Sequence, residues 1–251
     1  METRNCLIFA AGLGTRLKPI TDTMPKAMVP VGGKPLVQRL LEKLRREGFS
    51  QVVINVHHFA DQIEGFVKAN DGFGLDVRFS DERAMLLDTG GGVRRAARLF
   101  DSPHQPFLIH NVDILSHVRL ARFLDKSVEG LDLSLPFARL LVSRRKTSRY
   151  LLFNEENRLV GWTNIQTGEV KTPYPHLEVA RMKKYAFSGI HVFSPRLLPW
   201  MESWGERFPV IDFYLSVCHQ VPIYGSFRPV LKLLDVGKLD SLEQAERFVQ
   251  P

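Results

Sequence analysis

A glycine-rich loop carrying two cations follows the first apolar segment of the chain. Gly12 and Gly14 are followed by Arg16 and Lys26, with two prolines between the cations. Glycine allows a ligand to approach the backbone closely, and successive backbone N–H groups in such a turn can hold phosphate oxygens. The prolines restrict the loop, and the cations add positive charge. This combination predicts a site for a polyphosphate; the alternative is a surface loop whose glycines serve only the turn.

The first half of the chain alternates between apolar strand-like segments and amphipathic helix-like segments. Strands are predicted at 6–11, 52–56, 75–79 and 107–110, and helices at 37–48, 63–67, 93–100 and 120–124. This alternation predicts a mostly parallel sheet with helices on both faces. Ligands of such sheets collect beyond the carboxyl ends of the strands. The glycine-rich loop and Asp113 both follow predicted strands, so we expect them at one edge of the sheet.

Strand-like segments dominate after about residue 131. Strands are predicted at 131–141, 150–153, 159–162, 185–193 and 230–234, and helices at 195–201, 210–221 and 239–249. Polar residues and two prolines between 167 and 184 indicate an exposed excursion. The predicted fold class is α/β, with a Rossmann-like, mostly parallel sheet and a β-rich second half. We expect a single domain over residues 1–251.

Composition limits the kinds of partner. The 251 residues are 44% hydrophobic and 24% charged, typical of a globular domain of this size. No apolar run approaches the ~20 residues of a membrane span, and the N-terminus lacks a signal-peptide pattern, so we expect a cytoplasmic protein with no membrane partner. The net charge of +7 comes from scattered basic residues, which suits small anions better than nucleic acid. Two cysteines form neither a disulfide framework nor a zinc site.

The loop resembles the signature of the sugar nucleotidyltransferases, G-x-G-T-R-x-x-P-x-T-x-x-x-P-K-x-x-x-P-V-x-x-K-P. The matching residues are Gly12, Gly14, Thr15, Arg16, Pro19, Thr21, Pro25, Lys26, Pro30, Val31, Lys34 and Pro35. Further motifs of that family are matched at 87–92, 111–113, 185–190 and 234–237, so the resemblance covers nearly the whole chain. The strings Leu-Asp-Thr-Gly-Gly-Gly and Asn-Val-Asp are most similar to the N-acetylmuramate-1-phosphate uridylyltransferase group.

The resemblance implies Mg²⁺-dependent transfer of a nucleotidyl group from a nucleoside triphosphate to a sugar 1-phosphate, with release of pyrophosphate. It favours UTP and an amino-sugar phosphate such as N-acetylmuramate 1-phosphate. The alternatives are mannose or heptose 1-phosphate with GTP, glucose 1-phosphate with dTTP, and phosphocholine with CTP. A regulatory protein that binds nucleotide-sugars is the non-enzymatic alternative. The protein is expected as a monomer or a homo-oligomer.

The same resemblance assigns roles to individual residues. The catalytic residues are Arg16, Lys26 and Asp113, and the Mg²⁺ ligands are Asp113 and Asp235. The nucleotide-binding residues are Ala11, Gly12, Gly14, Thr15, Arg16, Asp88, Thr89 and Gly90, and the sugar-binding residues are Asn164, Ser188, Gly189 and Asp212. A base edge is within reach of Asp81, Glu82 or Arg83, and the pattern does not choose among them. Residues 1–130 form the nucleotide-binding half, and residues 131–251 form the sugar-binding half with a closing helix.

These residue types suit the reaction. The attacking phosphate oxygen is already anionic at neutral pH, so no strong general base is needed. The difficulty is bringing two polyanions together, which calls for positioning and charge neutralisation. Mg²⁺ prefers carboxylate, water and phosphate oxygens, so two aspartates together with the substrate suffice to hold it.

Overall fold

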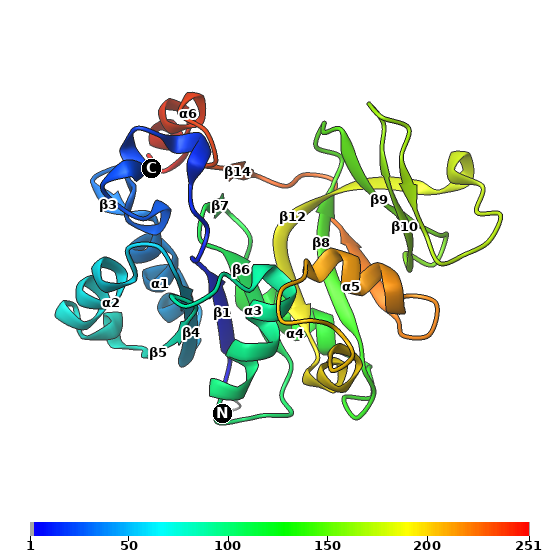
Figure 1. The fold of residues 1–251 in the computed structure, drawn as a ribbon, viewed down its shortest axis with the longest axis horizontal. Coiled ribbons are helices and arrows are strands. Elements are labelled where there is room, and N and C mark those ends of the chain that lie inside the picture. Colours follow the sequence, from blue (N-terminus) through cyan, green and yellow to red (C-terminus); the bar gives the residue numbers. More distant parts are fainter. Residues whose placement is uncertain (1–2, 251) are drawn as a thin grey trace.

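One mixed sheet runs through the molecule, and the computed structural model describes residues 3–250 (Figure 1). Within those residues the sheet has ten strands. The strands of the first half are β1 (Asn5–Phe9), β4 (Gln51–Val56), β5 (Asp76–Asp81) and β6 (Phe107–Asn111). They are all parallel, in the order β5-β4-β1-β6. The predicted α/β class with a central, mostly parallel sheet is confirmed.

Helices cover both faces of this sheet, as expected. The helices on one face are α1 (Leu36–Arg46), α2 (Ala60–Ala69), α4 (Leu120–Val128) and α6 (Asp240–Phe248). The helices on the other face are α3 (Asp88–Ala96) and α5 (Val210–Val217). Alternate residues of β1 separate the two cores, because Cys6 and Ile8 belong to the first and Leu7 to the second.

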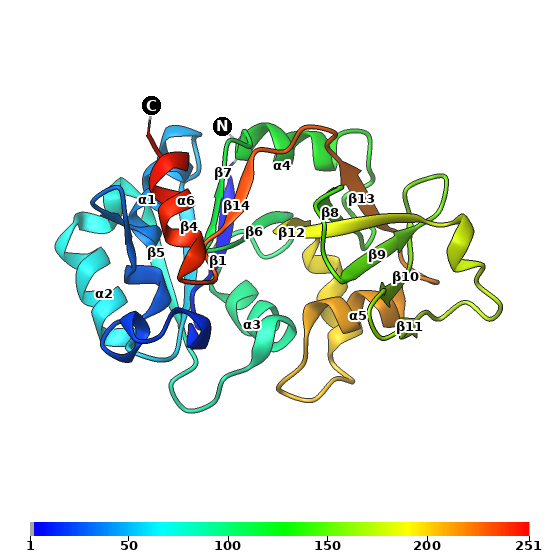
Figure 2. The ribbon, with the colours of Figure 1, turned by 90° about the horizontal axis from the view of Figure 1, so that it is seen from above.

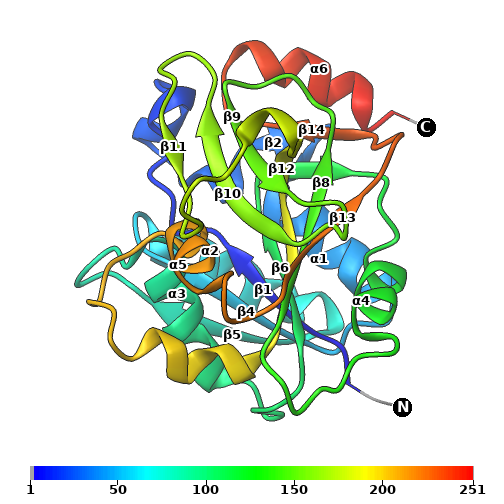
Figure 3. The same ribbon diagram turned by 90° about the vertical axis from the view of Figure 1, so that its right-hand side faces the viewer.

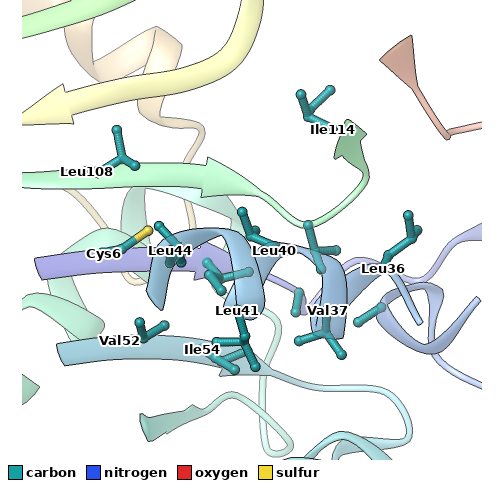
Figure 4. Close-up of a cluster of buried hydrophobic side chains, with 14 of the residues drawn as sticks. Cys6, Leu36, Val37, Leu40, Leu41, Leu44, Val52, Ile54, Leu108 and Ile114 are labelled. Atoms are coloured by element: carbon teal, nitrogen blue, oxygen red, sulfur yellow. The ribbon is translucent and has the colours of Figure 1, made fainter. Parts of the chain in front are cut away.

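Helix α1 illustrates how the sequence produces these layers. Its buried residues Leu36, Val37, Leu40, Leu41 and Leu44 recur at helical spacing and form one apolar stripe. Figure 4 shows this stripe against side chains of β1, β4 and β6. The helix ends where Gly48 takes a left-handed φ of 78° and the N–H of Phe49 donates to the carbonyl of Leu44 (3.0 Å).

The second half extends the same sheet through β12 (Lys183–Phe193), which is antiparallel to β6. Beyond it lie β9 (Arg149–Phe153), β10 (Leu159–Asn164) and the short edge strand β11 (Val170–Lys171). A branch from β12 leads to β8 (Ala138–Ser143) and β13 (Ile223–Phe227). Figure 3 views the molecule from this half, with β9, β10 and β11 as outer strands. The sheet therefore continues across residue 130, and the functional division into two halves there stays a prediction.

Several predicted elements of the second half differ from the structure. The strand predicted at 131–141 begins only at Ala138, because Leu133 and Leu135 lie exposed in a loop. The helix predicted at 195–201 is a 3₁₀ helix that contains Pro199, and α5 ends at Val217 instead of residue 221. Strand β13 was not predicted. The excursion at 167–184 contributes β11, which pairs with β10.

The chain returns to the first half near its C-terminus. Strand β14 (Leu233–Asp235) pairs antiparallel with β7 (Ile114–Ser116), which follows β6. The predicted final strand at 230–234 is thus shifted, with Val230 82% exposed. Helix α6 follows and contacts both β14 and the hairpin strand β2 (Pro30–Val31), whose partner is β3 (Lys34–Pro35). Figure 2 shows α6 beside β14. This return brings residues near 235 to the loop after β6.

Candidate active site

The loops that follow β1 and β6 meet at the edge of the sheet. Strand β1 lies between β4 and β6, so chain connections run in opposite directions on its two sides, and ligands bind at such a point in α/β sheets. The N–H of Val112 donates to the carbonyl of Phe9 (3.1 Å) and holds the two loops together. A cavity of about 310 Å³, here called the central cavity, opens at this point. Its lining residues are Phe9, Ala10, Ala11, Gly12, Lys26, Asn55, Glu82, Leu86, Asp88, Thr89, Asn111, Val112, Asp113 and Arg207.

The lining contains many of the predicted substrate residues. Those that line the cavity are Ala11, Gly12, Lys26, Asp88, Thr89 and Asp113. Within residues 3–250, the predicted residues outside its lining are Gly14, Thr15, Arg16, Gly90, Asn164, Ser188, Gly189, Asp212 and Asp235. Gly12 does not use a positive φ, and no atom of the described chain comes within 4 Å of where its Cβ would stand. The open space at Gly12 leaves its backbone accessible from the cavity.

Lys26 reaches Asp113 across the cavity. The loop that carries Lys26 is folded by Gly14, which has a φ of 64° and whose carbonyl accepts from the hydroxyl of Thr21 (2.9 Å). The Lys26 ammonium group forms an ion pair with the Asp113 carboxylate, and their side chains are 12% and 16% exposed. A cation and a carboxylate from loops far apart in sequence are thus brought into contact.

Asp235 lies beside Asp113. The N–H of Val236 donates to the carbonyl of Asp113 (2.8 Å) where β14 pairs with β7. Asp235 keeps contact with solvent, but partial desolvation at this edge raises the pKa of its carboxyl, and the negative charge of Asp113 raises it further, while Lys26 and Arg16 act in the opposite direction. Two carboxylates that repel each other and two nearby cations therefore share one region of the edge.

This region fits the chemistry of a divalent cation. Two carboxylates in close proximity are the donor set that Mg²⁺ accepts when substrate oxygens and water complete its shell. No three histidine, cysteine or acidic side chains converge on a metal site among residues 3–250, so a full protein-only shell is not formed there. Arg16 is close by, since a Cβ at Gly237 would lie 2.9 Å from its Nη2 and 2.6 Å from Oδ1 of Asp235.

The turn at the start of α3 forms another wall. Asp88 takes a positive φ of 58°, and its Oδ1 accepts from the N–H of Thr89 (2.6 Å). The N–H of Gly90 is already engaged, because it donates to the carbonyl of Phe208 (2.7 Å). A Cβ at Gly90 would lie 2.3 Å from the Phe208 ring. The glycines of this turn thus make room for a protein segment packed against α3.

That segment is residues 202–209, here called the arm, and it carries Arg207 to the cavity. The guanidinium group of Arg94 donates to the carbonyls of Met201, Trp204 and Gly205 (2.9 Å each) and fixes the arm on α3. Arg207 is exposed and lines the central cavity. The sequence did not indicate Arg207, because no local motif marks it and its position depends on how the arm docks.

The predicted sugar residues fall into two groups. Gly189 has a φ of 71°, and a Cβ there would lie 2.8 Å from Nδ2 of Asn111, which lines the central cavity. Ser188 is next to it and buried, and its hydroxyl has no hydrogen-bond partner within residues 3–250. Asn164 and Asp212 instead line a separate cavity of about 430 Å³. The structure therefore places Gly189 directly behind a lining residue of the central cavity, whereas Asn164 and Asp212 lie at a different cavity.

The three residues left open for base recognition differ in environment. Asp81 and Arg83 form a surface ion-pair network with Asp61 and Glu64. Glu82 points the other way and is completely buried in the wall of the central cavity. Of the three, only Glu82 lines the cavity.

Comparison with known proteins gives two kinds of relatives. The N-acetylmuramate alpha-1-phosphate uridylyltransferase of Caulobacter vibrioides is 41% identical over 109 residues, which is 43% of this chain and 44% of the relative. The UTP–glucose-1-phosphate uridylyltransferase of Synechocystis is 27% identical over 257 residues, covering 97% of this chain and 62% of the relative. The chain thus matches less than two thirds of the length of these curated relatives.

The fold matches that of a solved structure over nearly its full length. The crystal structure of HddC from Yersinia pseudotuberculosis, complexed with GMP-PN, has a TM-score of 0.74 and 19% sequence identity, and covers 99% of this chain and 100% of that one. At this identity the likeness shows a shared fold. In the described residues no helix is long and apolar enough to span a membrane.

A family model places these observations in one class. The model described as "Nucleotidyl transferase" matches residues 5–250, which is nearly the whole chain. It agrees with the names of the relatives and confirms the family resemblance predicted from the loop motif. The chain belongs to the nucleotidyl transferase family.

Proposed function

We propose that the protein catalyses Mg²⁺-dependent transfer of a uridylyl group from UTP to a sugar 1-phosphate, with N-acetylmuramate 1-phosphate as the preferred acceptor. The observation that carries this proposal is the meeting of Lys26, Asp113 and Asp235 at the central cavity. The uridylyltransferase names of both relatives support UTP, and the Caulobacter relative supports the muramate acceptor.

The reaction exchanges one phosphoanhydride bond for another. An oxygen of the sugar phosphate attacks the α-phosphorus, the bond to the β-phosphate breaks, and pyrophosphate leaves with its electron pair. Asp113 and Asp235 would hold Mg²⁺, which would supply positive charge that neutralises the phosphates. The ammonium group of Lys26 binds the phosphate oxygens that gain charge in the transition state, which is where a preorganised cation is most effective.

The other residues hold the substrates. Arg16, outside the cavity lining, binds the outer phosphates and the departing pyrophosphate. The backbone of Gly12 and the turn formed by Asp88 and Thr89 hold the nucleoside. The N–H of Ala11 donates to Oδ1 of Asn55 (3.2 Å) and is not free for the nucleotide. Ala11 therefore contributes to nucleotide binding as part of the cavity wall.

The sugar lies on the side of the cavity formed by the second half of the sheet. Gly189 packs against Asn111 of the cavity lining, and the hydroxyl of the adjacent Ser188 has a free donor and a free acceptor. Asn164 and Asp212 stay proposed acceptor residues at their separate cavity, where Nζ of Lys171 lies 3.4 Å from Oδ1 of Asp212.

The test is pyrophosphate release across a matrix of nucleoside triphosphates and phosphorylated acceptors, with and without Mg²⁺. We expect the highest kcat/KM with UTP and N-acetylmuramate 1-phosphate, and no release without a divalent cation. A preference for GTP with mannose 1-phosphate, dTTP with glucose 1-phosphate or CTP with phosphocholine would replace the proposed substrates. Nucleotide-sugar binding with no release for any pair would support the regulatory alternative.

A further inference from the structure

The central cavity contains a buried pair of polar side chains that the reaction described above does not use. Asn55 is 3% exposed on β4, and Glu82 is 0% exposed just after β5. The Nδ2 group of Asn55 donates to Oε1 of Glu82 (2.8 Å). Asn55 is a single polar residue in an apolar stretch of its strand, and most buried polar side chains have at least one hydrogen-bond partner.

Both side chains also bind the backbone of the two substrate loops. Oδ1 of Asn55 accepts from the N–H groups of Ala10 (2.7 Å) and Ala11 (3.2 Å), at the start of the glycine-rich loop. Oε2 of Glu82 accepts from the N–H of Leu87 (3.0 Å), at the start of the Asp88–Thr89 turn. A continuous chain of hydrogen bonds therefore runs from one loop, through Asn55 and Glu82, to the other.

The residues around Asn55 and Glu82 leave room for this series of hydrogen bonds. A Cβ at Gly92 would lie 3.1 Å from Oε1 of Glu82 and 3.2 Å from Nδ2 of Asn55, so glycine leaves room for the pair. Burial raises the pKa of Glu82, while the hydrogen bonds from Leu87 and Asn55 lower it. Both oxygens of Glu82 are already acceptors within the protein, which disfavours Glu82 as the group that reads a base edge.

We propose that Asn55 and Glu82 are positioning residues that hold the glycine-rich loop and the Asp88–Thr89 turn at a fixed separation, so that the nucleotide meets both at once. The expected effect on nucleotide kinetics rests on the proposed function. The expected effect on the mobility of the two loops does not depend on that function.

Each hydrogen bond in this series has a fixed donor and a fixed acceptor, which permits a specific test. In Glu82→Gln the new amide must place its NH₂ group against the N–H of Leu87 or against Nδ2 of Asn55, so two donors face each other. In Asn55→Asp two carboxylates face each other in a buried site. In the double variant the new carboxylate would accept from Ala10, Ala11 and the new amide, and the oxygen of that amide would accept from Leu87. Every bond is then restored, with the charge moved from one position to the other.

The experiment compares the wild type, the two single variants and the double variant by steady-state kinetics and by amide hydrogen exchange. We expect each single variant to lower kcat/KM for the nucleotide about tenfold to hundredfold, chiefly through KM. Exchange should become faster at Ala10, Ala11 and Leu87, while amides of α4 keep their protection. The double variant should return both readouts to within about threefold of the wild type. Asp76→Asn and Arg78→Ala, which form a surface ion pair on the same strand β5, are the matched controls and should change neither.

Single variants with unchanged exchange at the two loops would overturn the inference, as would a double variant no better than the worse single one. Uniformly faster exchange throughout the protein would also overturn it, because the pair would then act on global stability. If the wild type transfers no nucleotide at all, the proposed function fails, and the exchange measurements alone decide this inference.

Discussion

Lys26 and Asp113 lie 87 residues apart in the sequence and form an ion pair in the wall of the central cavity. Both side chains are more than four-fifths buried, so water screens them less than it screens a surface pair. In the proposed reaction this contact would be exchanged for contacts with phosphate and metal when substrates bind. The free protein thus holds each charge near the position in which the proposed reaction would use it.

Removing the cation tests this arrangement most directly. We predict that Lys26→Ala lowers kcat by on the order of 10²- to 10³-fold, the range found when a group that stabilises transition-state charge is lost. The circular dichroism spectrum should be unchanged. Lys18→Ala is the control, since Lys18 is in the same loop but pairs with Asp22 on the surface. Turnover like that of the wild type in Lys26→Ala would remove this residue from the mechanism.

The role of Asp235 can be tested by measuring stability without Mg²⁺ and activity as a function of the Mg²⁺ concentration. In Asp235→Asn a neutral group replaces a carboxylate whose charged form is disfavoured by partial desolvation and by Asp113. We predict an unchanged or higher melting temperature without Mg²⁺, and at least about a tenfold higher Mg²⁺ concentration for half-maximal activity. Asp240→Asn, on the exposed start of α6, should leave the Mg²⁺ dependence unchanged. A Mg²⁺ titration of Asp235→Asn that overlays the wild type would exclude Asp235 as a ligand.

Arg207 supplies a prediction that no sequence motif offered. It is exposed where the arm meets the cavity, so it can bind the nucleotide without being buried at the reacting phosphate. We predict that Arg207→Ala raises KM for the nucleotide about tenfold and changes kcat less than about twofold, the signature of lost uniform binding. Arg98→Ala, an exposed residue just after α3, is the control. Equal KM values for the wild type and Arg207→Ala would leave Arg207 without a role in binding.

The glycines at the start of α3 are predicted to serve the arm. A Cβ at Gly91 would lie 2.1 Å from the carbonyl oxygen of Glu206, a backbone atom that cannot move alone. We predict that Gly91→Ala destabilises the protein by about 1–3 kcal/mol and displaces the arm. Gly205→Ala, within the arm, should be nearly neutral, because no described atom lies within 4 Å of its added Cβ. Chemical denaturation measures both, and equal stabilities would contradict the close packing.

Local sequence patterns predicted the first half of the fold better than the second. Buried parallel strands such as β4 are almost continuously apolar, and amphipathic helices separate them, so both signals are strong. Strand β13 carries no such signal: it contains Tyr224, Gly225 and Ser226, and it forms because β8 lies alongside it. In the loop before β8, Leu133 and Leu135 are apolar yet exposed, and periodicity cannot distinguish such a loop from a strand.

The site residues also divide into those that a sequence motif indicated and those whose place depends on tertiary packing. The loop motif indicated Lys26 and the motif at 111–113 indicated Asp113, and both the loop and Asp113 follow strands that end at the edge where ligands bind. The position of Arg207 depends on the docking of the arm, which no local pattern encodes. Glu82 was one of three candidates for a base edge, and its pairing with Asn55 depends on the packing between β4 and α3. One signal was available for Asn55, since a lone amide within the buried segment from Val52 to Val56 calls for a specific partner.

Acid stability gives a prediction independent of catalysis. His191 on β12 is 1% exposed, and neither ring nitrogen has a hydrogen-bond partner in the described chain. Burial lowers the pKa of His191 to about 3, and the nearby His110 contributes in the same direction. The unfolded chain, with an ordinary histidine pKa of about 6.5, binds the proton more readily than the folded one, so stability falls as pH decreases below that value.

We therefore predict that His191→Phe, which keeps a ring of similar shape against Tyr214, removes part of this acid sensitivity. Between about pH 7 and pH 5 the wild type should lose on the order of 2 kcal/mol more unfolding free energy than His191→Phe does. Urea denaturation at both pH values measures the difference. His219→Gln, at an exposed position after α5, is the control and should follow the wild type. Parallel stability curves for the wild type and His191→Phe would mean that His191 is not held neutral by its burial.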